Sequence, residues 1–134
     1  MQFPDDYPEN LMDQIEECGG EFEVEYVYRI LGYGLNDPKS FWSSYQEMKN
    51  GIQPLRKKLV IGHYSTSCNT SIEVLKERLK LTGRKYPRPT IGKGYTAPCC
   101  GPILRSKTDT HVHWWIFKDS QPWKHFKEMS EDNE

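Results

Sequence analysis

One arginine and a run of three hydroxyl residues are the side chains of this sequence whose types and order suggest ligand chemistry. Arg29 ends the alternating run "EFEVEYVYR", and Ser65, Thr66 and Ser67 stand together in "GHYSTSCNTS". A guanidinium can donate two parallel hydrogen bonds to a phosphate or carboxylate, while nearby hydroxyl groups fix the geometry of the bound anion. If the two strands lie side by side, these side chains share one cleft. The plainer interpretation also stays open: a strand end with a helix cap, and a surface arginine.

The order of these motifs resembles the arginine, Ser-Thr-Ser, glutamate class of ADP-ribosyltransferase folds. The resemblance runs from about residue 24 to residue 117, through "YVYRILGYG", "GHYSTSCNT", a helical segment and "PTIGKGYTAPCCGPI". In that family the first-strand arginine holds the nicotinamide ribose and phosphate of NAD, and the Ser-Thr-Ser triplet shapes the nicotinamide pocket. The resemblance implies NAD or a related small-molecule nucleotide as the ligand. It implies catalytic roles for Arg29, Ser65, Thr66 and Ser67, and a cofactor site made by Arg29, Tyr64, Ser65, His111 and His113.

The catalytic glutamate of that family has no counterpart at the expected place. No carboxylate occurs between Glu77 and Asp109, and the last apolar strand reads "THVHWW". An imidazole cannot supply the fixed negative charge that stabilises an oxocarbenium-like transition state. Two possibilities stay open: a nucleotide-binding relative without turnover, or chemistry of another kind on the same scaffold.

The histidines of "HVH" suggest a second kind of site. His111 and His113 lie two apart, so in a strand both imidazoles point to the same side, and Cys99 or Cys100 could add a thiolate for zinc. Further candidate ligands are His63 and Cys68. Against this, His111 and His113 share a face with Trp115 and Phe117, and the two imidazoles can be the polar end of a packed aromatic row. Because the four cysteines show no CxxC spacing, no metal is expected.

Charge is distributed unevenly along the chain. Residues 1–28 contain nine carboxylates and no lysine or arginine, whereas residues 56–107 contain twelve lysines and arginines and only two carboxylates. This asymmetry makes a non-enzymatic protein-interaction or regulatory module the alternative to a nucleotide-binding protein. Tryptophans near lysines in the last third could stack on single-stranded nucleic acid. The chain has no clustered basic run, so nucleic acid is not an expected partner.

The elements that must position these residues follow from hydrophobic periodicity. Helices are predicted at 8–20, at 38–48 behind an Asp37 cap, at 70–83 behind a Thr70 capping box, and after Ser120 over Trp123 and Phe126. Strands are predicted at 21–31, 57–65, 87–96 and 110–118, with a loop at 97–109. In the first strand the even-numbered side chains are expected to face the core, which leaves Arg29 on the polar face.

These elements together indicate the fold class. Helices and strands alternate, but at least one connection is long and the strands alternate in polarity, which favours an α+β domain with a small mixed or antiparallel sheet and three to four short helices. A length of 134 residues suits one domain, expected at 1–129 with a disordered tail at 130–134. No apolar run approaches the roughly 20 residues of a membrane span, and the acidic start lacks signal-peptide features, so a cytoplasmic location is expected.

Overall fold

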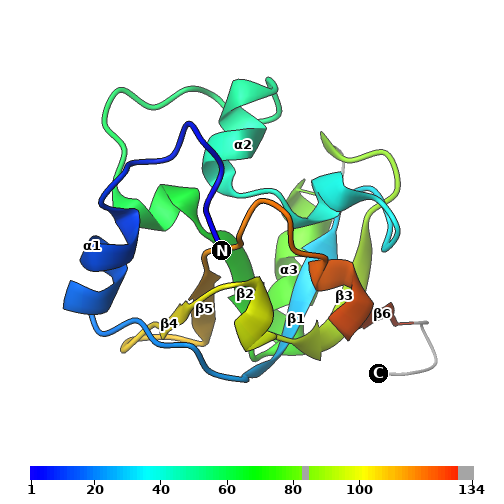
Figure 1. The fold of residues 1–134 in the computed structure, drawn as a ribbon. Coiled ribbons are helices and arrows are strands. Elements are labelled where there is room, and N and C mark those ends of the chain that lie inside the picture. Colours follow the sequence, from blue (N-terminus) through cyan, green and yellow to red (C-terminus); the bar gives the residue numbers. More distant parts are fainter. Residues whose placement is uncertain (83–84, 130–134) are drawn as a thin grey trace.

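In a computed structural model, which describes residues 1–82 and 85–129, these residues form a six-stranded antiparallel sheet and three α-helices (Figure 1). The helices are α1 (Leu11–Glu17), α2 (Ser44–Lys49) and α3 (Ile72–Thr82). The strands are β1 (Tyr26–Leu31), β2 (Thr66–Asn69), β3 (Thr90–Tyr95), β4 (Ile103–Arg105), β5 (His111–Trp114) and β6 (Phe126–Glu128). They lie in the order β4-β5-β2-β1-β3-β6, which confirms the predicted α+β class.

Two parts of the sequence-based description lie outside the described residues. These are the tail at 130–134 and the helix stop at Gly83. Among the residues that are described, no helix combines the length and the apolar character needed to cross a bilayer.

Two apolar clusters cover the two faces of the sheet. Trp114 and Trp115 are neighbours in an extended segment, so their side chains point to opposite faces, and both are fully buried. Trp114 packs with a cluster that includes Val27, Leu31 and Val112, whereas Trp115 packs with Leu11, Ile15 and Tyr7. Figure 1 shows α1 beside β4 and β5, and α3 behind β1. The two helices therefore cover different parts of the sheet, with α3 in contact with both β1 and β2.

The orientation predicted for the first strand is wrong. In β1 the side chains of Val27, Arg29 and Leu31 are buried, whereas Tyr26 is 73% exposed. The large aromatic residues at even positions favoured the opposite face in the sequence. The face was decided instead by Val27 and Leu31, which pack against Cys68 and Phe41 in the main core. Arg29 consequently lies on the buried face of the sheet.

The strand predicted at 57–65 is also wrong. Residues Ile61–Tyr64 form a 3₁₀ helix, and the strand begins only at Thr66, so the hydroxyl run starts a strand where it was expected to end one. The backbone N–H of Val60 donates to Nδ1 of His63 at 2.9 Å, which fixes the turn. Ile61 contributes its side chain to the second cluster and its carbonyl to the Trp115 indole N–H at 2.9 Å. The local bond between Val60 and His63 and the long-range bond from Trp115 together outweigh the β-propensity of "LVI".

The predicted helical segments are helical, but their limits, caps and helix types differ from the prediction. Asp37 caps a 3₁₀ helix at Pro38–Phe41 as expected, but Ser43 then begins α2 with a capping box of its own. The cap of α3 comes from the Ser71 hydroxyl, which accepts from the Val74 N–H, in place of Thr70. The closing helix is only a 3₁₀ helix at Pro122–His125 followed by β6, and the predicted cap residue Ser120 instead donates to the Phe117 carbonyl. The loop at 97–109 includes the short strand β4.

Gly101 and Gly51 provide a matched test of how tightly the sheet is packed. Both have positive φ, but a Cβ on Gly101 would lie 1.8 Å from the Trp115 carbonyl oxygen, whereas nothing lies within 4 Å of one on Gly51. We expect Gly51→Ala to lower the free energy of unfolding by about 1 kcal/mol and Gly101→Ala by about 4 kcal/mol, since only the second adds overpacking to strain. Urea denaturation measures both values. Equal losses in the two variants would contradict the described packing.

Candidate functional site

The sheet opens between β1 and β2. Strand β1 pairs with β3 at six positions but with β2 at only one, Tyr28 opposite Asn69. Beyond this pair the guanidinium of Arg29 lies where the ladder would continue. Its Nη1 donates to the Ser67 carbonyl at 2.5 Å, its Nε to the Ser40 carbonyl at 2.8 Å and its Nη2 to the Trp42 carbonyl at 3.2 Å. Arg29 is only 9% exposed, so these bonds hold the guanidinium in a fixed orientation.

A cleft of about 240 Å³ opens at this gap. Its walls come from β1, β2, α2, α3 and the segment after α3, so residues far apart in sequence meet there. The polar side chains around it are Arg29, Ser44, Glu47, Gln53, Ser67, Arg78, Thr82, Lys85 and Tyr86. Arg29 and Ser67, which were expected to share a cleft if their strands lie side by side, both line it.

Charge within the cleft is separated into two regions. Arg78 and Lys85 are exposed cations at its rim, whereas the carboxylate of Glu47 is buried on the α2 side. Gln53 donates to this carboxylate at 2.7 Å and the Tyr86 hydroxyl donates at 3.1 Å. Burial, followed by the charge of Glu47, raises the pKa of the Tyr86 phenol. Tyr86 therefore stays protonated and acts as a hydrogen-bond donor that orients Glu47.

Two serine–histidine pairs lie side by side on the next strands. Ser67 Oγ is 2.5 Å from Nε2 of His111, and Ser65 Oγ is 2.7 Å from Nδ1 of His113. The Ser65 hydroxyl gives its one hydrogen to the Gly62 carbonyl at 2.8 Å, so Nδ1–H of His113 must be the donor to Ser65. In this tautomer His113 cannot take a proton from Ser65 through Nδ1.

Burial keeps both imidazoles neutral near pH 7. Burial, together with the neighbouring His111, lowers the pKa of His113 to about 4. Burial and the charge of Arg78 also lower the pKa of His111, while Asp109 opposes the shift. The Asp109 carboxylate accepts from the backbone N–H of His111 at 2.9 Å. Because that bond does not involve the ring, Asp109 does not orient the imidazole as the acid of a hydrolytic triad does.

The seven residues predicted for the site are only partly brought together. Arg29 and Ser67 line the cleft, and His111 adjoins it through the Ser67 hydroxyl. Ser65 and His113 bond to each other on the face of the sheet that also carries the side chains of Ser67 and His111. Thr66 is buried on the opposite face, where its hydroxyl donates to the Phe41 carbonyl at 2.7 Å, and Tyr64 packs against Tyr7 and Tyr45. Ligand roles for all seven stay predictions.

The zinc ligands considered from the sequence are not assembled as a set. His111 and His113 bond to serine hydroxyls, whereas Cys99 and Cys100 lie beside His125.

Most of the cleft residues were missed by reasoning from the sequence, including Arg78, Glu47 and Tyr86. Arg78 lies three residues after Leu75 and four before Thr82, so helical spacing could have placed it on the face that meets the sheet. Glu47 and Tyr86 carry no such signal, because they lie 39 residues apart and meet only through the path of the chain.

Comparisons of this chain with protein-family models, curated proteins and solved structures find no match. The resemblance to ADP-ribosyltransferases therefore rests on the sequence motifs alone, of which only Arg29 and Ser67 are among the residues that line the cleft.

The neutral His113 predicts a pH-dependent stability. Its pKa of about 4 lies below the value of about 6.5 in an unfolded chain, so its contribution is complete above pH 6.5 and is lost as pH falls towards 4. Allowing for partial exposure of the ring, we expect the wild type to lose about 1 to 2 kcal/mol more than His113→Gln between pH 7 and pH 4.5. Urea denaturation at the two pH values measures this difference. Parallel losses would show that the imidazole titrates normally.

Proposed function

We propose that this protein binds NAD or a closely related nucleotide in the cleft between β1 and β2, as a relative of ADP-ribosyltransferases. The observation that carries the proposal is that Arg29 and Ser67, from two separate sequence motifs, meet in one cleft where the sheet opens. Of the five N–H groups of Arg29, three bond to main-chain carbonyls and the other two have no hydrogen-bond partner among the described residues. A phosphate oxygen is a suitable acceptor for them.

The separation of charge supports NAD over a simple anion. Oxidised NAD carries a negative pyrophosphate and a positive pyridinium ring, and the cleft offers exposed Arg78 and Lys85 on one side and buried Glu47 on the other. A cleft of about 240 Å³ is smaller than a typical pocket for a whole drug-sized ligand, so it suits the nicotinamide-ribose end. The pyrophosphate would then lie at the rim near Arg78 and Lys85, where water screens the cations only partly.

Glu47 is the carboxylate that this arrangement presents to the positively charged end of the ligand. Glu47 lies on α2. In ADP-ribosyltransferases, which this sequence resembles, the catalytic glutamate lies on a late strand. The proposal therefore concerns nucleotide binding and assigns no turnover to Glu47.

A charge-removal pair on α3 tests the proposal. We expect Arg78→Ala to weaken NAD binding about tenfold, roughly 1.4 kcal/mol, because it removes a cation from the cleft rim. Lys80→Ala, on the same helix, removes a charge whose 3.1 Å partner is Glu77 and which does not line the cleft, so it should leave the affinity unchanged. Isothermal titration calorimetry at low ionic strength measures both. Absence of binding by the wild type, or equal effects of the two substitutions, would refute the proposal.

The role of Glu47 is tested by comparing oxidised and reduced NAD, which differ in the charge of the nicotinamide ring. The wild type should prefer oxidised NAD by about fivefold, roughly 1 kcal/mol, because the buried carboxylate attracts the pyridinium. Glu47→Gln retains an acceptor for the Tyr86 hydroxyl and should abolish the preference. Circular dichroism of the variant checks the fold. A preference that survives the substitution would place the ring elsewhere.

A further inference from the structure

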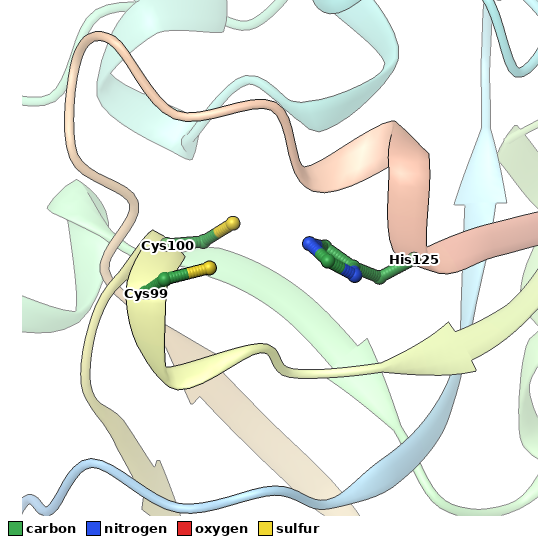
Figure 2. Close-up of side chains that lie close together, drawn as sticks. All are labelled: Cys99, Cys100 and His125. Atoms are coloured by element: carbon green, nitrogen blue, oxygen red, sulfur yellow. The ribbon is translucent and has the colours of Figure 1, made fainter.

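A cluster of two cysteines and one histidine lies away from the nucleotide cleft. The sulfur atoms of Cys99 and Cys100 and a ring nitrogen of His125 all lie within 4.8 Å of one another. Figure 2 shows both sulfurs pointing toward the edge of the imidazole. None of the three residues lines the cleft between β1 and β2.

The backbone explains how two adjacent cysteines reach the same partner. In an extended strand neighbouring side chains point to opposite faces. Here Pro98–Cys100 form a 3₁₀ turn with Pro98 at its first position, and Gly101, at φ 145°, ends it. Within such a turn successive side chains are separated by about 120°, so both sulfurs can lie on one side.

His125 is oriented from behind, as a metal ligand usually is. Its Nδ1 is 3.0 Å from the Tyr95 hydroxyl, and the two rings pack at 5.1 Å. This bond leaves Nε2 as the nitrogen for a metal, and such outer partners set the orientation of ligating imidazoles. The Cys100 side chain is buried beside the main core, whereas that of Cys99 is exposed. The histidine is therefore held in place by Tyr95, and burial restrains Cys100.

We propose that Cys99, Cys100 and His125 bind a zinc ion through two sulfurs and one nitrogen. In a tetrahedral zinc site the sulfurs lie about 3.8 Å apart and each lies about 3.5 Å from the nitrogen, so shifts of about 1 Å complete the geometry. Two sulfurs and an imidazole favour zinc over magnesium or calcium, which take oxygen ligands. Cys99 is exposed, so water can occupy the fourth position.

The test uses the full chain, freed of metal and kept reduced, titrated with Co²⁺ and then with Zn²⁺ against a chromophoric chelator. We expect one equivalent of Co²⁺ to produce a thiolate-to-cobalt charge-transfer band and the visible bands of tetrahedral cobalt, and one equivalent of Zn²⁺ to remove them. Absence of these bands at one equivalent, together with no zinc retained against the chelator, would overturn the proposal.

The variants separate this site from other thiols. Cys99→Ser and His125→Gln should each weaken zinc affinity at least about a hundredfold, and Tyr95→Phe, which removes only the outer hydrogen bond, about tenfold. Cys18→Ser, which changes an exposed thiol at the end of α1, should bind zinc as the wild type does. Cys99 is exposed, so its replacement should leave the fold intact, and thermal unfolding checks this. Zinc binding unaffected by Cys99→Ser and His125→Gln would place the metal elsewhere and refute the site.

Discussion

The buried guanidinium of Arg29 is the constraint on which the centre of this fold depends. It donates to main-chain carbonyls of Ser40, Trp42 and Ser67, which belong to the segment before α2 and to β2. A buried charge and buried carbonyls are each costly without partners, and here three N–H groups of the guanidinium bond to three such carbonyls. The Arg29 side chain thus replaces the missing main-chain hydrogen bonds between β1 and β2. It also holds the segment before α2 beside the gap.

The chemistry of the cleft follows from this interruption of the sheet. A continuous ladder would have brought β1 and β2 together along their length, whereas the gap lets side chains from α2, α3 and the following segment converge on Arg29. Ser67 links Arg29 to the histidine pair. Its carbonyl accepts a hydrogen bond from the Arg29 guanidinium, and its hydroxyl bonds to His111. A charged cleft therefore adjoins two imidazoles that burial keeps neutral.

The sequence predicted the α+β fold class, because local periodicity carries that information, and it offered a cleft shared by Arg29 and the hydroxyl run only on the condition that their strands lie side by side. It failed where long-range packing decided between alternatives. The face of β1 depends on Val27 and Leu31 finding the core, and "LVI" at 59–61 becomes a turn because Trp115 bonds to the Ile61 carbonyl. Glu47 and His125 escaped prediction for the same reason. Their partners, Tyr86 for Glu47, and Tyr95 and the two cysteines for His125, are brought near only by the tertiary path.

The two edge strands, β4 and β6, limit how the sheet can associate with other protein chains. Each is only three residues long, and each carries charges, with Arg105 on β4 and Lys127 and Glu128 on β6. Short charged borders discourage the main-chain pairing by which exposed sheets recruit further strands. Self-association and fibril growth by sheet extension are therefore disfavoured, and contacts with other molecules are directed to side-chain surfaces.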